Sequence, residues 1–89
     1  MRKTQLNGKK MDTREHAHHH LKKQLRLPAW YGANLDALWD LLSTCGEAVQ
    51  VTLVNRGDLT SALGEYGEQL IRVLEDAERQ NSKLSFRIM

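Results

Sequence analysis

The most constraining feature of the sequence is the stretch over residues 27–43, which reads LPAWYGANLDALWDLLS. Pro28 disfavours helix at the residue before it and fixes its own φ, so the stretch must open as a loop. Gly32 disfavours regular secondary structure a second time within this stretch. Asn34 belongs to the residue types that cap helix N-termini by accepting a hydrogen bond from a first-turn amide. The sequence therefore predicts a loop followed by a helix over 34–44.

The predicted helix has an apolar face and an acidic face. At about 100° per residue, four leucines share one broad arc that we expect to be buried, namely Leu35, Leu38, Leu41 and Leu42. Asp36 and Asp40 are four residues apart, so they lie one above the other on a different face. Ser43 falls beside this pair, and Trp39 falls at the seam between the two faces. The aspartates form either a solvated acidic face or a preformed anion pair that docks onto a cationic site.

The same stretch resembles the central motif of the barstar family of ribonuclease inhibitors. The resemblance is carried by Leu27-Pro28 and by the run Tyr31-Gly32-x-Asn34-Leu35-Asp36-Ala37-Leu38-Trp39-Asp40. It is strong over residues 21–42, and the rest of the chain agrees with the family in length and element order. It implies a three-stranded parallel sheet with four helices, and a protein that binds a ribonuclease.

The resemblance also implies a role for particular residues. Asp40 would occupy the phosphate site of a barnase-type enzyme, and Asp36 would meet a flanking basic group. Trp30, where the family usually has tyrosine, would cover the catalytic cleft, unless it only packs the loop down. Asp76 would reach in from the long helix in place of a family glutamate. The full set of expected partner-binding residues is Trp30, Gly32, Asn34, Asp36, Trp39, Asp40, Ser43 and Asp76.

A function follows from these roles as an expectation. The chain would be a cytoplasmic inhibitor, or immunity protein, that blocks the active site of an extracellular ribonuclease or of a ribonuclease toxin. The acidic helix and the aromatic loop would mimic the RNA phosphate. Trp39 and Ser43 would border the contact, although a tryptophan at such a position is more often part of the core. We expect the free inhibitor to be a monomer.

Three strands and four helices are predicted along the chain. Strands are predicted over 1–6, 49–54 and 84–88. Helices are predicted over 13–26, 34–44, 59–63 and 67–80. The order β-α-α-β-α-α-β, with helical crossovers between strands, favours a parallel sheet and the α/β class, as in the barstar family. The order of strands within the sheet stays open.

Local signals set the ends of several predicted elements. Asn7-Gly8 is a turn signal after the first strand, which is otherwise weak in β-propensity. Asp12 and Glu15 have the spacing of a capping box at the start of the first helix. Asp58 is expected to cap the third helix, and Gly64 to close it.

Size and composition predict one domain over residues 1–89. The single cysteine, Cys45, excludes an internal disulfide and fits a reducing compartment. We expect this thiol to be inert, because no activating base is apparent. No apolar run has the length of a membrane span, so we expect a cytoplasmic protein without membrane contact.

Charge is unevenly distributed along the chain. Residues 1–29 carry eight basic and two acidic residues, whereas residues 30–89 carry five basic and nine acidic residues. A second hypothesis is therefore a nucleic-acid-binding or regulatory module that uses the basic segment, with Arg14, Lys22, Lys23 and Arg26 along one helix. The segment lacks the aromatic or glycine interleaving of base readers, so we expect no direct nucleic-acid contact.

The sequence carries no recognisable catalytic signature. It contains no glycine-rich phosphate loop, zinc quartet or nucleophile–base motif. Asp36 and Asp40 would need a concave pocket to act as an acid/base pair, so we expect neither an enzyme nor a cofactor. His16 and His20, one helical turn apart, have a spacing that can hold zinc, but neighbouring lysines oppose a cation. For His18, the family pattern suggests a packing role.

Overall fold

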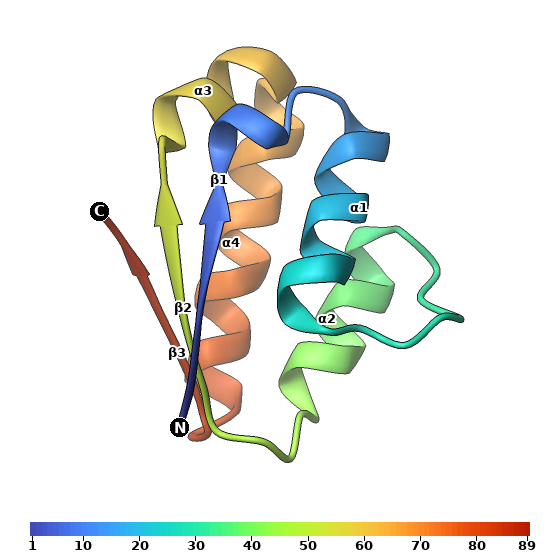
Figure 1. The fold of residues 1–89 in the computed structure, drawn as a ribbon, viewed down its shortest axis with the longest axis vertical. Coiled ribbons are helices and arrows are strands. Elements are labelled where there is room, and N and C mark those ends of the chain that lie inside the picture. Colours follow the sequence, from blue (N-terminus) through green and yellow to red (C-terminus); the bar gives the residue numbers. More distant parts are fainter.

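A three-stranded parallel sheet forms one layer of the computed structural model, which describes residues 1–89 (Figure 1). Its strands are β1 (Arg2–Asn7), β2 (Val49–Val54) and β3 (Leu84–Ile88). They lie in the order β1-β2-β3, which is also their order in the sequence. The register pairs Thr4 with Val51, and Val51 with Phe86.

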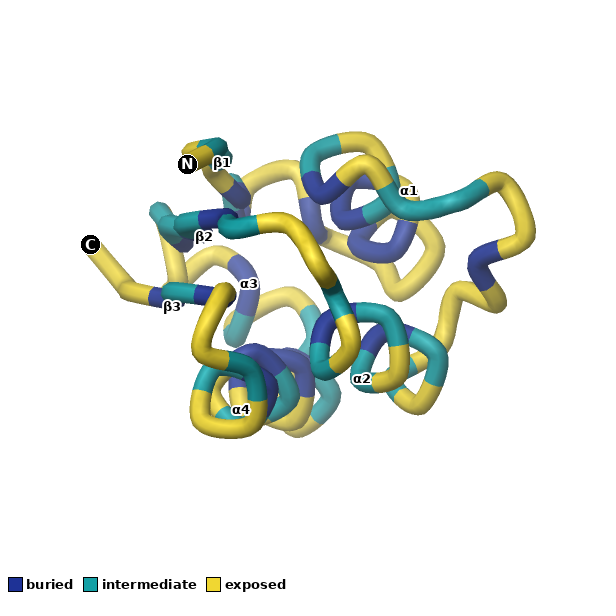
Figure 2. The backbone as a smooth tube through the Cα atoms, turned by 90° about the horizontal axis from the view of Figure 1, so that it is seen from below, coloured by how far each residue is buried: buried dark blue, intermediate teal, exposed yellow.

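Helices form the second layer. They are α1 (Arg14–Leu25), α2 (Leu35–Ser43), α3 (Arg56–Leu63) and α4 (Glu65–Gln80), with a short 3-10 helix, η1 (Gly8–Lys10), after β1. Figure 2 shows α1, α2 and α4 together on one side of the sheet, while α3 lies at the end of the sheet where β2 finishes. The predicted α/β class, the parallel sheet and the four helices are confirmed.

The alternation of β2 explains why the helices cover a single face. Val49, Val51 and Leu53 are buried beneath the helical layer, whereas Gln50 and Thr52 between them are half-buried and point to the other face. Successive side chains of a strand point to opposite faces, so an alternating strand can bury only one of them. A parallel sheet covered on both faces would need a continuous apolar run.

The predicted cap of the first helix and the predicted start of the third helix are wrong, although the first helix lies where it was predicted to within one residue. Thr13, not Asp12, caps α1 by accepting a hydrogen bond from the amide of His16. Asp12 instead binds the His16 imidazole. The helix α3 begins at Arg56, before Asp58, because Asn55 adopts a left-handed conformation and turns the chain directly from β2.

The start of α4 also differs from its prediction over 67–80. Gly64 has a φ of 58°, which ends α3 and redirects the chain so that α4 begins at Glu65. This backbone conformation favours glycine because a Cβ would be strained there. Glu65 and Glu68 in the first turn complement the helix dipole. None of the helices combines the length and the apolar character that a membrane-spanning segment needs.

Candidate functional site

The loop between α1 and α2 turns one aromatic residue outward and its neighbour inward. The amide of Tyr31 donates to the carbonyl of Pro28 at 3.0 Å, which closes a tight turn. Trp30, within this turn, is 76% exposed, whereas the ring of Tyr31 is buried. Trp30 does not pack the loop down, because the buried ring of Tyr31 does so. The indole is left free at the surface.

Asn34 and Gly32 shape the start of α2. The Asn34 side-chain oxygen accepts from the Ala37 amide at 2.8 Å, which confirms the predicted cap. Its amide nitrogen donates to the Gly32 carbonyl at 3.2 Å. A Cβ on Gly32 would lie 3.3 Å from that same nitrogen, so a larger residue would crowd the cap. The polar atoms of Asn34 are therefore engaged within the protein.

Asp36 and Asp40 are both exposed on α2 and are free of internal partners. The ion pairs of the protein lie elsewhere and join Arg2 to Glu47, His16 to Asp12, Arg56 to Glu68 and Arg79 to Asp76. The two carboxylates thus present unneutralised negative charge, four residues apart on one helix. Neighbours at this spacing lie about 5–6 Å apart at their Cβ atoms.

The helix that carries this pair is held at its buried face and at its C-terminal end. Leu38 and Leu42 are buried in the core, while the other two predicted core leucines are half-buried. The side-chain amide of Asn81, at the end of α4, donates to the carbonyls of Leu42 and Cys45 at 2.9 Å each. The Leu42 carbonyl also accepts from the Cys45 amide, so the bonds from Asn81 add a tertiary link to a helix end that is already closed locally. Helix α2 is therefore anchored to α4.

Trp39 and Ser43 lie beside the acidic pair. Trp39 is half-buried and packs against the core, as expected for a residue at the seam between the two faces. The hydroxyl of Ser43 donates to the carbonyl of Asp40 at 3.4 Å, and that of Thr44 donates to the same carbonyl at 2.6 Å. These bonds leave the Asp40 carboxylate itself uncommitted.

Asp76 is placed differently from the acidic pair. It lies on α4, is partly exposed, and binds the guanidinium of Arg79 one turn further along the helix. A partner cation would have to compete with Arg79 for this carboxylate. The structure therefore does not present Asp76 as a free anion, because Arg79 lies three residues further along the same helix and pairs with it.

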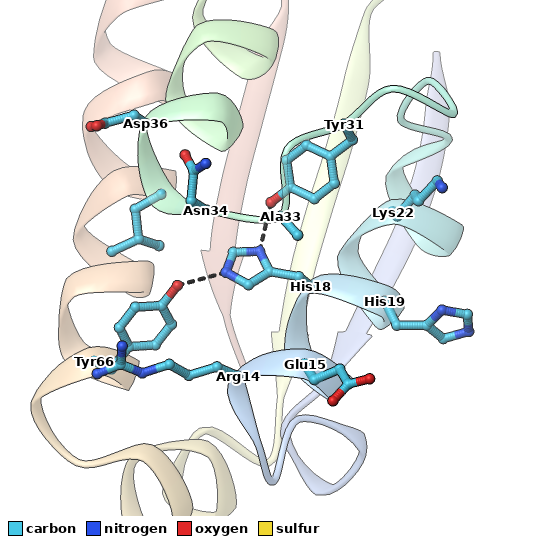
Figure 3. Close-up of a pocket in the computed structure, with 11 residues that line it drawn as sticks. Arg14, Glu15, His18, His19, Lys22, Tyr31, Ala33, Asn34, Asp36 and Tyr66 are labelled. Carbon is cyan, nitrogen blue, oxygen red and sulfur yellow. Dashed lines mark hydrogen bonds between the residues drawn. The ribbon is translucent and has the colours of Figure 1, made fainter.

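A cavity of about 680 Å³ lies next to the loop, between α1 and the first turns of α2 and α4 (Figure 3). His18 lies in its wall, with Nδ1 2.6 Å from the hydroxyl of Tyr31 and Nε2 2.6 Å from that of Tyr66. Burial lowers the pKa of His18 and raises the pKa of both phenols. The sequence predicted a packing role for His18, but no local pattern linked it to Tyr66.

Several basic residues of the N-terminal segment are engaged internally. Arg2 donates to Glu47 and to the carbonyl of Gln24. The Arg14 guanidinium lies over the ring of Tyr66, 4.1 Å from its centroid. Lys22 Nζ is 3.4 Å from the carbonyl oxygen of Ala29. Of the four basic residues in the nucleic-acid hypothesis, Arg14 and Lys22 thus have contacts within the protein, while Lys23 and Arg26 are exposed.

The histidine pair considered for metal binding is divided between two separate contacts. His16 binds Asp12, with 2.6 Å between Nδ1 and the carboxylate. Nε2 of His20 accepts a hydrogen bond from the amide of Asn7 at 3.0 Å, so this ring nitrogen is already in use. No group of three or more metal-ligating side chains is brought together in the structure.

Comparison with known proteins finds a family model that matches the whole chain and a relative that aligns with most of it. The family model described as barstar (barnase inhibitor) matches residues 1–89. A protein of Bacillus subtilis (strain 168), named "Putative ribonuclease inhibitor YrdF", is 31% identical over 81 residues. The aligned region covers 90% of this chain and 89% of that protein.

Proposed function

The chain belongs to the barstar family, and on this premise we propose that it inhibits a barnase-type ribonuclease by occupying its active site. A ribonuclease toxin of the same type, for which this chain would be the immunity protein, is an equivalent target. Like the inhibitors for which the family is named, the chain acts as a binding protein and carries out no reaction of its own.

The observation that carries this proposal is the unpaired state of Asp36 and Asp40. Two exposed carboxylates repel one another on a helix that could have neutralised them with a lysine or arginine one turn away. Helix α2 holds them in a fixed relation through its buried leucines and its bonds to Asn81. An anion site that is already formed in the free protein loses little conformational entropy when it meets a cationic partner.

The chemistry of the partner follows from that of the pair. A ribonuclease binds the RNA phosphate with basic side chains, and a carboxylate can take the place of the phosphate because arginine donates two parallel hydrogen bonds to either group. Asp40 is proposed to occupy the phosphate position and Asp36 to meet a flanking basic group. Surface charge of this kind also accelerates association with a basic protein.

The neighbouring residues would complete the contact. Trp30, in the loop before α2, offers a large exposed aromatic surface. Tryptophan side chains often dominate the binding energy when they are buried in a complex. Trp39 and Ser43 would form the rim. Gly32 and Asn34 would contribute through the backbone, since the Asn34 side chain is committed to the cap. Asp76 would contribute only if the partner displaces Arg79.

The proposed function also implies a place of action. An inhibitor of this kind would act inside the cell, where it would protect RNA from an enzyme that the cell secretes or from a toxin that enters. It would do so as a monomer that forms a one-to-one complex with the ribonuclease.

The test is inhibition of RNA cleavage by barnase, with Asp40→Ala compared against Glu75→Ala. Glu75 is a matched control because it is also an exposed acidic residue inside a helix and makes no ion pair. Removing one partner of a buried, hydrogen-bonded charge pair costs about 3–5 kcal/mol. The inhibition constant of Asp40→Ala should therefore rise roughly 100- to 5,000-fold, and that of Glu75→Ala should stay near the parent value.

Two results would count against the proposal. A parent protein that leaves barnase fully active would contradict a barnase-type target. An Asp40→Ala variant that inhibits as strongly as the parent would contradict phosphate mimicry by the acidic pair.

A further inference from the structure

A hydrogen-bonded bridge joins the loop before α2 to both α1 and α4. The His18 imidazole on α1 lies between the hydroxyls of Tyr31 and Tyr66, with 2.6 Å on each side (Figure 3). His18 and Tyr31 are buried, and Tyr66 is half-buried at the start of α4. Tyr31 directly follows Trp30, so the bridge ends one residue from the exposed indole.

We propose that His18 is a positioning residue of the inhibitor surface. Through Tyr31 it fixes the loop that carries Trp30, and Tyr66 in turn fixes the imidazole. This inference rests on the proposed function, and it adds to the surface a residue that makes no contact with the ribonuclease.

The other contacts of the loop are weaker or local. The bond from the Tyr31 amide to Pro28 lies within the loop itself and cannot hold it to the body of the protein. Lys22 reaches the carbonyl of Ala29 at 3.4 Å from an exposed position, where water competes for the bond. The Leu27 amide donates to the Lys22 carbonyl at 3.0 Å, but this bond holds only the start of the loop. The Tyr31–His18 pair is the buried side-chain hydrogen bond that joins the tip of the loop to α1.

A neutral imidazole has one acceptor nitrogen, which can take the proton of one tyrosine hydroxyl. A protonated imidazole donates from both nitrogens, so neither hydroxyl proton keeps an acceptor within the bridge. Tyr31 is a buried residue and its hydroxyl makes no other hydrogen bond within the protein, so we infer the tautomer in which Nδ1 accepts its proton. Nε2 then carries the imidazole proton and donates to Tyr66, whose hydroxyl is nearer to solvent. Protonation of Nδ1 would leave the Tyr31 hydroxyl proton buried without a partner.

The surroundings of His18 keep it neutral near physiological pH. Burial lowers its pKa. Besides the two phenols, the titratable groups along the cavity are Arg14, Glu15, His19 and Lys22 on α1, and Asp36 on α2. None of these makes a hydrogen bond to the imidazole, and Figure 3 shows the Asp36 carboxylate pointing away from it. The bridge is thus expected to be intact at neutral pH and to weaken in acid.

Amide hydrogen exchange in the free protein tests the bridge directly. The quantity to measure is the protection of the Tyr31 amide relative to that of Val51 in the central strand. His18→Gln keeps a polar side chain but cannot titrate, and His20→Gln is the matched control. His20 is also buried on α1, and its imidazole binds the Asn7 amide of β1 instead of the loop.

His18→Gln should lower the relative protection of the Tyr31 amide by about fivefold or more, the change expected for the loss of one ordinary hydrogen bond. In the parent this relative protection should fall as the pH is lowered from about 7 to about 5, the range in which histidines titrate. His18→Gln should remove that pH dependence, and His20→Gln should retain it. A purely structural role of His18 would lower the protection of both amides together.

Tyr66→Phe provides a milder variant if His18→Gln does not fold. It removes one hydroxyl and keeps the ring beneath Arg14. The relative protection of the Tyr31 amide should again fall, and the dissociation constant for barnase should rise about fivefold.

Two outcomes would overturn the inference. One is an equal effect of His18→Gln and His20→Gln on the ratio of the two amides. The other is a parent ratio that does not change with pH. Because exchange is measured without a ribonuclease, this failure is distinct from failure of the proposed function, which the Asp40→Ala inhibition assay addresses.

Discussion

Replacement of Asp40 by alanine should stabilise the free protein while it destroys inhibition. The Asp40 carboxylate has no ion-pair or hydrogen-bond partner in the structure, so the substitution removes no favourable contact. It does remove a repulsion from Asp36 one helical turn away. Opposite signs for stability and for binding are the signature of a residue kept for a partner.

Helix propensity and charge repulsion both contribute to the expected gain in the free energy of unfolding. In a helix interior, alanine is favoured over aspartate by about 0.5 kcal/mol. Relief of a like-charge pair at this spacing adds about 0.2–0.5 kcal/mol. The free energy of unfolding of Asp40→Ala should therefore exceed that of the parent by about 0.7–1 kcal/mol, which corresponds to an increase in Tm of about 3–8 °C for a domain of this size.

Two further variants separate the contribution of helix propensity from that of charge repulsion. Asp40→Asn removes the charge with little change in helix propensity, so it should stabilise by only about 0.2–0.5 kcal/mol. Asp36→Ala should change the stability very little. Asp36 lies in the first turn of α2, where its charge interacts favourably with the helix dipole by about 0.3–1 kcal/mol, and the loss of this interaction offsets the gains.

Urea unfolding followed by far-ultraviolet circular dichroism measures these differences. The gain from Asp40→Asn should shrink in high salt, because repulsion between exposed charges is screened there. If Asp40→Ala instead lowers the free energy of unfolding by more than about 0.5 kcal/mol, the carboxylate has a stabilising partner in the free protein. Asp36 and Asp40 would then not be an anion pair without a partner in the free protein.

Three other outcomes are expected. Burial lowers the pKa of His18 and of His20 below the ordinary value of 6.5, so the unfolded chain binds more protons than the folded protein at low pH. The Tm should therefore fall as the pH drops below about 6.5. The Asp12 carboxylate raises the pKa of His16, which opposes this trend, but His16 is exposed and solvent screens the effect. Asn34→Ala should destabilise the fold by about 1 kcal/mol in urea unfolding, because the first turn of α2 loses its cap. Leu38→Ala should cost about 2–5 kcal/mol in the same assay, since a fully buried side chain leaves a cavity.

The sequence by itself determined the elements whose signals are local. The Asn34 cap and the leucine spacing that follows it define α2, and the structure has the helix where these signals place it. The alternation in β2 identified a strand with one buried face. The exposed positions of Asp36 and Asp40 also followed from helix geometry, because residue spacing fixes which side chains share a face.

The predictions failed where two local signals compete. Thr13 and Asp12 are both good cap residues, and the choice between them depended on a side-chain contact with His16. The predicted helix over 67–80 begins two residues earlier in the structure, at Glu65. The positive φ of Gly64 permits this earlier start, because it turns the chain directly from α3 into α4.

Only the tertiary structure decided how distant residues meet. Residue spacing within one helix cannot tell that His18 lies between Tyr31 and Tyr66, since one of these partners is 48 residues away. The strand order, and the use of Asn81 to hold the end of α2, depend on contacts of the same kind. Hydrophobic periodicity indicates which face of a helix or strand is buried, but it does not indicate which other element covers that face. The acidic pair could thus be found from the sequence, and the bridge that positions the loop beside it could not.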